Sequence, residues 1–348
     1  MNGDKETISI LFTGDLHIGR TSRLLRHGLP GGTGSTTDAW HRTVDLALSR
    51  NVDLVLVCGD LVDADTGFHE ALEPVIQGIA RLEQRGITTL AIAGNHDYSL
   101  LPRLVDRVNS PGLHLLGRDG TWQRYLHHQD GQCMLAVDGW SFPRAHVRQD
   151  PVCMYQPHDP GVPVLAMAHG LLDVPDTVQA PLDRRLMQNL PLHGWILGHY
   201  HSPPGERQDP GAPLILYIGS AQALGPSERG FHGPWLARAG RKGVEHLQQL
   251  SVSDVRYETI CIDISGLDTE DRVESAVLSR VYALAREVAA ESGEVLRYLS
   301  LRLELTGTAL PEARLAATAS GLKNMQLQTG LCRVGIDEIR YEKLPCFA

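Results

Sequence analysis

Short apolar runs alternate with helical stretches along the first hundred residues. Three runs are rich in β-branched residues and predict buried β-strands at residues 7–13, 53–58 and 87–93. Residues 38–49, with Asp38 as the expected N-cap, and residues 68–85 have a helical pattern. This β-α-β-α-β order predicts an open α/β sheet, in which functional side chains collect at the carboxyl ends of the strands.

Closely spaced strand-like runs with few helices form the middle of the chain. They lie at residues 133–138, 164–168, 195–197, 214–218, 234–236 and 244–250. This spacing predicts a second, more antiparallel sheet that packs on the first and that includes the last two runs.

A second domain is expected beyond Arg256. Residues 271–290 carry apolar side chains at helical spacing, and residues 297–305 alternate apolar and polar side chains, as in a strand with one buried face. The region has no motif typical of a metal site. We therefore divide the chain into an α/β domain of residues 1–256 and a small α+β domain of residues 257–348.

The overall charge limits how the protein can hold an anionic substrate. The 348 residues are 42% apolar and 21% charged, as in an ordinary globular protein, and their net charge is −9. Proteins that hold nucleic acid by bulk charge are usually basic. An anionic substrate would therefore have to be attracted locally, by metal ions or by a small basic patch.

Cysteine usage and the lack of long apolar runs predict a cytoplasmic protein. The six cysteines lie far apart and none forms a C-x-x-C pair, which is typical of reduced cysteines rather than of a disulfide frame or a structural zinc site. The N-terminal residues are polar and show no signal peptide. No apolar run approaches the roughly 20 residues that span a bilayer, so no membrane partner is expected.

Five short motifs of acidic residues, asparagine and histidine recur along the chain, most of them directly after an apolar run. They are Gly14-Asp15-Leu16-His17, Gly59-Asp60, Gly94-Asn95-His96-Asp97, His169-Gly170 and Gly198-His199-Tyr200-His201. In extended geometry, residues i and i+2 point to the same side. Asp15 and His17 are therefore expected to reach one metal ion together, and the glycines are expected to allow close approach of the backbone.

The motifs supply two carboxylates, one amide oxygen and four imidazoles. A single such residue at a strand end is more often a helix cap, a turn former or a solvated side chain. The joint pattern instead predicts two divalent metal ions held by Asp15, His17, Asp60, Asn95, His169, His199 and His201. Mixed oxygen and nitrogen ligands without thiolate favour manganese, iron, zinc or magnesium.

Two metal ions roughly 3.5–4 Å apart suit the hydrolysis of phosphate esters. A hydroxide bridging the two ions would attack phosphorus in line. His96 follows the ligand Asn95, so it is the expected general acid or transition-state stabiliser. Asp97 is expected to orient His96, to cap the helix that follows, or both.

The motif set resembles that of the calcineurin-like metallophosphoesterases, and within them that of the SbcD-type DNA repair nucleases. The resemblance covers most of the chain. The five motifs are specific for the superfamily. Residues 217–222 and 227–236, together with the small α+β tail, are similar to segments of the nuclease branch.

The resemblance implies a four-layer α/β/β/α sandwich with a C-terminal capping domain that helps direct DNA to the metals. One ion would be held by Asp15, His17, Asp60 and His201, and the other by Asp60, Asn95, His169 and His199. It also implies manganese-dependent exonuclease or endonuclease cleavage of DNA in repair or end processing. A homodimer and an SbcC-like coiled-coil ABC ATPase partner are implied as well.

Two departures from the family pattern change these expectations. Archaeal and eukaryotic relatives often have a further catalytic histidine where this chain has Asp63, so no catalytic role is assigned to Asp63. The chain ends at Ala348, where members that bind the ATPase usually continue with a linker and helices. The expectation of an ATPase partner is weakened accordingly.

Three hypotheses stay open. A DNA nuclease would use Arg20, Arg23 and Arg26, just past the first motif, to contact phosphates, although they equally fit a solvated basic segment. A small-molecule phosphodiesterase or phosphatase of the same superfamily would have no obvious need for the tail domain. A non-catalytic scaffold that binds DNA or an ATPase would be expected to have lost ligands, whereas all seven are present.

Overall fold

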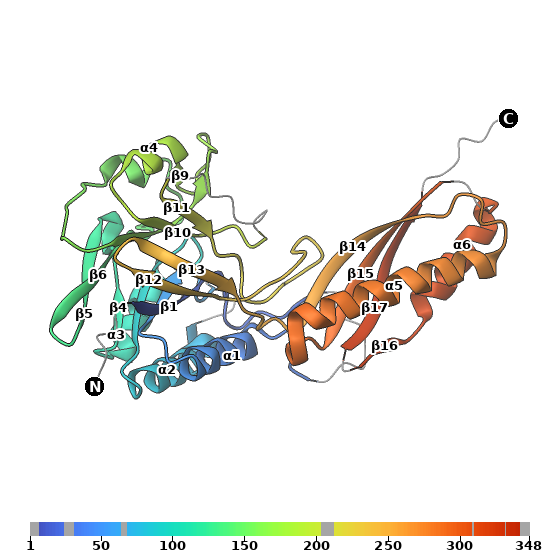
Figure 1. Cartoon of the computed structure of the whole chain (residues 1–348), viewed down its shortest axis with the longest axis horizontal. Helices are drawn as coiled ribbons and strands as arrows, with labels where there is room; N and C mark the ends of the chain where they lie inside the picture. Colours follow the sequence, from blue (N-terminus) through green and yellow to red (C-terminus); the bar gives the residue numbers. More distant parts are fainter. Residues whose placement is uncertain are drawn as a thin grey trace. The chain divides into compact units, whose positions relative to one another are not determined.

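The computed structural model divides into two compact units (Figure 1). It describes residues 7–23, 31–63, 68–202, 212–307, 310–330 and 332–341. The first unit takes its described residues from Met1–Arg20, Ser35–Ala221 and His232–Val252. The second takes them from Thr21–Gly34, Gln222–Phe231 and Ser253–Ala348.

A six-stranded sheet in the order β13-β12-β1-β2-β3-β4 forms one half of the first unit. Its strands are β1 (Ile8–Thr13), β2 (Leu54–Cys58), β3 (Thr88–Ile92), β4 (Leu113–Leu115), β12 (Trp235–Gly240) and β13 (Gly243–Gln249). Strands β1 to β4 are parallel, and the β12–β13 hairpin pairs antiparallel with β1.

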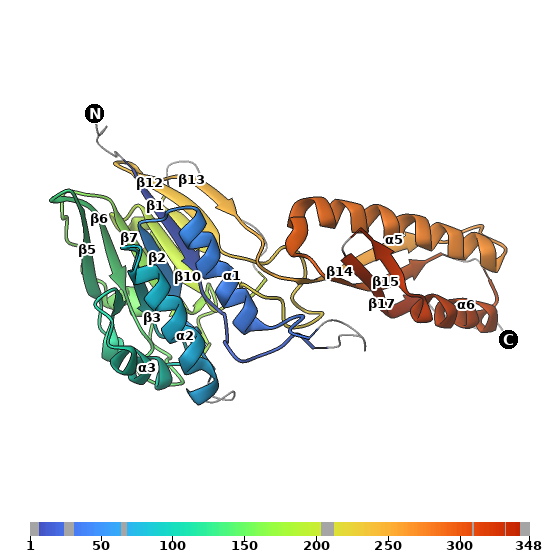
Figure 2. The ribbon, with the colours of Figure 1, turned by 90° about the horizontal axis from the view of Figure 1, so that it is seen from below.

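Three helices cover the outer face of this sheet (Figure 2). They are α1 (Thr36–Ser49), α2 (Phe68–Glu83) and α3 (Leu100–Val108). Their apolar side chains, among them Trp40, Val75 and Leu104, share one buried cluster with Leu11 and Val55 of the sheet. This burial holds the parallel strands, and hence their carboxyl ends, in place.

A five-stranded sheet in the order β11-β10-β7-β6-β5 packs on the other face of the first. Its strands are β5 (Gln123–Gln129), β6 (Gln132–Gly139), β7 (Val164–His169), β10 (Gly194–Gly198) and β11 (Leu214–Tyr217). Phe12 and Leu56 of the first sheet lie in one apolar cluster with Val137, Met167 and Ile196 of the second. The space between the two sheets is therefore a second apolar core of the unit, in addition to the one beneath the helices.

Short elements cover the outer face of the second sheet. They include η2 (Pro151–Met154), the strand pair β8 (Leu171–Leu172) and β9 (Pro181–Leu182), and α4 (Arg184–Asn189), while η1 (Arg118–Gly120) precedes β5. Val152 and Met187 pack there against Ala166 and Trp195. The order of layers is helices, sheet, sheet and short helical elements, so the predicted α/β fold class is confirmed.

The second sheet differs from the prediction in two respects. Three of its four strand pairs are parallel, and only β5–β6 is antiparallel. The runs at 234–236 and 244–250 lie in the first sheet, as β12 and β13. Strands β7 and β10 are buried along their whole length, and strands covered on both faces are typical of parallel pairing.

The start of α1 also differs from the prediction. Ser35 is the N-cap, and its hydroxyl accepts a hydrogen bond from the Asp38 N–H at 3.2 Å. Asp38 lies in the first turn instead. Its negative charge there interacts favourably with the helix dipole.

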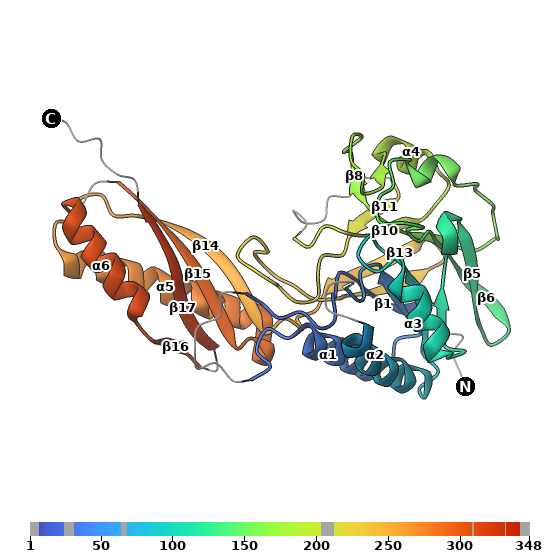
Figure 3. The same cartoon turned by 180° about the vertical axis from the view of Figure 1, so that it is seen from behind.

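The second unit is a four-stranded sheet in the order β14-β15-β17-β16, with two helices packed along it (Figure 3). Its elements are β14 (Val255–Asp263), α5 (Glu270–Ser292), η3 (Gly293–Val295), β15 (Tyr298–Thr306), α6 (Glu312–Asn324), β16 (Leu327–Thr329) and β17 (Cys332–Tyr341). Among the described helices of both units, none is long and apolar enough to cross a membrane.

Candidate metal centre

The five motifs meet at one edge of the two sheets in the first unit. Asp15, Asp60 and Asn95 follow the parallel strands β1, β2 and β3 within three residues of their ends. His169 is the last residue of β7, and His199 directly follows β10, its parallel neighbour. Because parallel strands present their carboxyl ends at the same edge, ligand-type side chains from both sheets converge there.

The backbone that carries the first motifs is not extended. Asp15, His17 and Asp60 have φ values of 46°, 46° and 50°, in the left-handed region that is unfavourable for residues with a side chain. The Asp15 N–H donates to the Gly59 carbonyl and the His17 N–H to the Asp60 carbonyl, each at 3.0 Å. The prediction that extended geometry aligns Asp15 with His17 is therefore wrong; paired turns bring them together.

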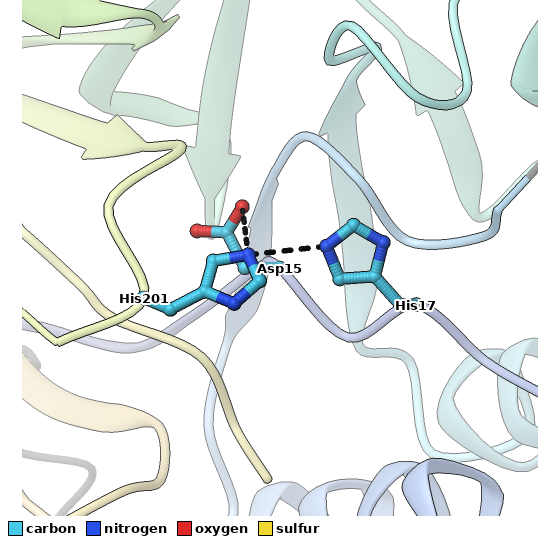
Figure 4. A group of neighbouring side chains, drawn as sticks. All are labelled: Asp15, His17 and His201. Carbon is cyan, nitrogen blue, oxygen red and sulfur yellow. Dashed lines mark hydrogen bonds and ion pairs between the residues drawn. The ribbon is translucent and has the colours of Figure 1, made fainter. Parts of the chain in front are cut away.

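One group of ligand-type atoms comes from the first and last motifs (Figure 4). The His201 ring faces both the Asp15 carboxylate and the His17 ring. His201 Nε2 lies 3.2 Å from His17 Nε2 and 3.8 Å from Asp15 Oδ1. Asp60 Oδ2 is 3.9 Å from His17 Nε2, so its carboxylate borders the same group.

A second group lies on the other side of Asp60. His169 Nε2 is 3.3 Å from Asp60 Oδ2 and 3.1 Å from Asn95 Oδ1. His199 Nδ1 is 3.0 Å from Asn95 Oδ1 and 3.3 Å from His169 Nε2. The structure thus brings all seven predicted ligands into two neighbouring groups that share the Asp60 carboxylate.

The outer nitrogens of three histidines are held by acceptors. His17 Nδ1 lies 3.0 Å from Asp63 Oδ2, and His169 Nδ1 lies 2.9 Å from the Cys58 carbonyl oxygen. His199 Nε2 lies 3.0 Å from Gln179 Oε1. An N–H donated outward leaves a lone pair on the inner nitrogen. Inward lone pairs beside carboxylates fit divalent cations, so the residues present suit the metal ions that their types predict.

The charges of the groups are consistent with this arrangement. Burial alone would raise the pKa of Asp60, but nearby His169 and His17 outweigh it and lower that pKa, so Asp60 is ionised. Burial, followed by the neighbouring His169, lowers the pKa of His199 to about 3. His199 is therefore neutral near pH 7, the form in which an imidazole ligates a metal.

Two glycines of the motifs allow this close packing. A Cβ atom on Gly94 would lie 2.2 Å from Asp60 Oδ1. A Cβ atom on Gly198 would lie 2.0 Å from the Cys58 carbonyl oxygen and 2.7 Å from His169 Nδ1. The predicted close approach of backbone to ligands is confirmed at both positions.

His96 stands at the edge of the two groups. Its side chain is 40% exposed, and Nδ1 lies 3.7 Å from Asp63 Oδ2. Its backbone N–H donates to Asp60 Oδ1 at 2.9 Å, which fixes the residue beside the shared carboxylate. The arrangement leaves the ring open to a substrate.

The side chains of Asp97 and His96, both described by the structure, share no hydrogen bond or ion pair. The fully buried carboxylate of Asp97 accepts hydrogen bonds from the N–H groups of Gly94 at 2.7 Å and Leu61 at 2.8 Å. Burial, and next the charge of Asp60, raises the pKa of Asp97 to about 7. Ser99, not Asp97, is the N-cap of α3. Asp97 therefore ties the turn after β2 to the turn after β3, rather than orienting His96 or capping the helix.

Sequence reasoning gave no role to two residues that lie near the proposed ligands. Asp63 is fully buried, holds His17 and forms an ion pair with Arg20. Its position three residues after Asp60, where relatives of the resembled family often have a histidine, was a usable signal. Gln179 lies in a polar loop with no motif around it, so nothing in the sequence pointed to it.

The three arginines expected to contact phosphates, Arg20, Arg23 and Arg26, do not lie in one part of the described structure. Arg20 belongs to the first unit and is paired with Asp63. Arg23 belongs to the second unit. Arg26 lies outside the described residues.

Residues 8–203 match the family model of the calcineurin-like phosphoesterases. The protein belongs to this family. The phosphoesterase is 26% identical to the DNA double-strand break repair protein Mre11 of Haloferax volcanii, over 77% of this chain and 57% of that protein. It is 28% identical to the protein of the same name from Thermoplasma acidophilum, over 55% of this chain and 51% of that protein.

A bacterial relative and a solved structure extend the comparison. The uncharacterized metallophosphoesterase YhaO of Bacillus subtilis is 24% identical, over 81% of this chain and 66% of that protein. A dimetal phosphatase from Danio rerio aligns with a TM-score of 0.43 and 13% identity, over 70% of this chain and 98% of that chain. The phosphoesterase thus spans only 51% to 66% of the length of these three curated relatives.

Proposed function

We propose that this phosphoesterase is a two-metal DNA nuclease that hydrolyses phosphodiester bonds in DNA repair or DNA end processing. The observation that carries the proposal is the pair of ligand groups that share Asp60. The DNA part is supported by the relatives, since two of them are named DNA double-strand break repair proteins.

The proposal assigns the ligands to two ions. Asp15, His17, Asp60 and His201 would hold one, and Asp60, Asn95, His169 and His199 would hold the other. Such a pair of ions supplies Lewis acidity to the phosphate and lowers the pKa of the attacking water. Manganese is the proposed metal because of the family resemblance, and oxygen and nitrogen donors without thiolate are compatible with it.

The side chains of this protein have separate tasks in the proposal. His96 is the proposed general acid, because its ring is exposed while its backbone is fixed to Asp60. A proton from this ring would neutralise the leaving alkoxide of the cleaved strand. Asp97 acts one layer further out, as a positioning residue that holds the turns carrying Asp60 and Asn95.

The proposal includes two interaction partners besides DNA. A homodimer and an SbcC-like coiled-coil ABC ATPase are both proposed from the family resemblance alone. Light scattering of the purified protein measures the first. Co-purification with a candidate ATPase of that class measures the second.

The function is tested by incubating the purified protein with manganese and three substrates: end-labelled duplex DNA, single-stranded DNA circles and a chromogenic phosphodiester. Cleavage of duplex or single-stranded DNA supports the nuclease. Hydrolysis of the chromogenic ester with both DNA substrates intact would contradict it and favour a small-molecule phosphodiesterase. A protein that binds two manganese ions and cleaves nothing would favour a non-catalytic scaffold.

A further inference from the structure

We propose that Gln179 is a positioning residue that determines which nitrogen of His199 faces the metal pocket. Gln179 Oε1 lies 3.0 Å from His199 Nε2. The other ring nitrogen, Nδ1, lies 3.0 Å from Asn95 Oδ1 and 3.3 Å from His169 Nε2. The inference rests on the two-metal part of the proposed function and is independent of DNA as the substrate.

The chemistry follows from the single proton of a neutral imidazole. One ring nitrogen carries the N–H and the other a lone pair. The Gln179 amide oxygen is an acceptor, so it stabilises the tautomer with the proton on Nε2. His199 Nδ1 then presents its lone pair to the pocket, as a ligand must. Without this acceptor, the tautomer with the proton on Nδ1 becomes more favourable, because the Nδ1–H can donate a hydrogen bond to Asn95 Oδ1.

The segment that carries Gln179 is fixed on two sides. On one side, the Val147 N–H donates to the Val178 carbonyl at 2.7 Å, and the Ala180 N–H donates to the Val147 carbonyl at 2.9 Å. On the other, the Leu171 N–H donates to the Ala180 carbonyl at 3.0 Å. Leu171 follows His169 by two residues. The backbone at Gln179 is thus tied to the strand end that supplies a neighbouring ligand.

The other two outer acceptors are less suited to a clean test. His169 is held by the backbone carbonyl of Cys58, which no side-chain substitution removes. His17 is held by Asp63, whose loss would also leave Arg20 without its buried partner. Removing the neutral amide of Gln179 creates no buried charge, so its effect on the metal is easier to interpret.

The test measures manganese binding by calorimetry and by electron paramagnetic resonance. Gln179→Met keeps the length of the side chain and removes the acceptor. We expect one of the two ions to bind about 10- to 100-fold more weakly, as for other lost outer contacts of metal ligands, while the second ion is unaffected. Gln179→Glu retains an acceptor and should bind both ions as the wild type does.

Gln123→Met is the matched control. Gln123 Oε1 also accepts a hydrogen bond, from the Gly117 N–H at 3.3 Å. Gln123 lies on β5, a strand that carries none of the proposed ligands. This variant should bind both ions normally. Thermal unfolding of the metal-free variants checks that they are folded. Gln179→Leu, which also lacks an acceptor, replaces the methionine variant if that one does not fold.

The outcomes separate this inference from the proposed function. Wild-type affinity for both ions in Gln179→Met overturns the inference, and so does an equal loss in Gln179→Glu, which would show that an acceptor of the same length does not restore the site. A wild-type protein that binds fewer than two ions refutes both the inference and the two-metal proposal. Two bound ions with DNA left intact refute the nuclease and leave the role of Gln179 standing.

Discussion

At the scale of single residues, the main addition to the expected site is the carboxylate of Asp63. It holds His17 Nδ1 at 3.0 Å and pairs with Arg20 in a fully buried position. Asp63→Ala removes the acceptor that orients His17. We expect the affinity for the manganese ion assigned to Asp15, His17, Asp60 and His201 to fall about 10- to 100-fold, measured by calorimetry. The control is the exposed Asp159→Ala; equal affinities in both variants would contradict this role.

His96 supports a separate prediction, because the proposed function assigns its ring to proton transfer and not to either metal ion. His96→Ala should still bind two manganese ions, since its backbone N–H, not its ring, contacts Asp60. Its kcat on duplex DNA should fall by about 100-fold or more, the loss usual for a general acid. The exposed His128→Ala is the control. A His96→Ala protein that cuts at the wild-type rate would refute the assignment.

Sequence reasoning picked out the seven proposed ligands, which the structure brings together, but not the contacts that hold them in place. Ligands at strand ends are visible because an apolar run and a following Asp or His are neighbours in the sequence. Gln179 approaches His199 from 20 residues away through a loop. The bonds of Asp97 to Leu61, rather than to His96 beside it, depend equally on tertiary packing. Such contacts have no local signature.

At the scale of elements, Arg124 of β5 and Asp138 of β6 form a cross-strand ion pair. Both guanidinium bonds are 2.7 Å, and Asp138 is 3% exposed and also bonded to the Tyr155 hydroxyl. Arg124→Met would leave a buried carboxylate without its counter-charge. We expect the free energy of unfolding to fall by about 3 kcal/mol, measured by urea denaturation.

The exposed pair of Arg118 and Asp106 is the matched control for this prediction. Solvent screens an exposed ion pair, so Arg118→Met should shift the urea midpoint far less. Equal midpoints for the two variants would mean that the pair between β5 and β6 contributes no more than a surface contact.

The strands themselves were predictable, but their partners were not. Burial on both faces gives β7 and β10 a continuous apolar sequence, which marks a strand without naming its neighbours. Strands β12 and β13 follow β11 in the chain yet join the first sheet, beside β1. That choice is made by the available edge of β1 and by the packing between the sheets, neither of which is encoded locally.

At the scale of the whole molecule, a net charge of −9 opposes the approach of DNA, so basic groups near the metal centre matter. A groove of about 800 Å³ in the first unit includes Pro181, two residues beyond Gln179. Arg184 in this groove pairs with Asp173 at 2.9 Å. Arg148 and Arg185 also line it, as do Asp150 and Asp183. Neither of these two arginines forms an ion pair with any residue that the structure describes.

In the proposed nuclease, Arg148 and Arg185 are the groups expected to contact DNA phosphates. Replacing both by Gln should weaken the binding of duplex DNA regardless of its sequence. The slope of log affinity against log salt should become shallower by about 1–2, because binding with fewer phosphate contacts releases fewer counterions. Hydrolysis of a small chromogenic phosphodiester should be unchanged, since neither side chain belongs to the ligand groups. Arg241→Gln, in a separate groove that Gln129 and Asp159 also line, is the control. An unchanged salt slope in the double variant would exclude this groove as the path of the DNA.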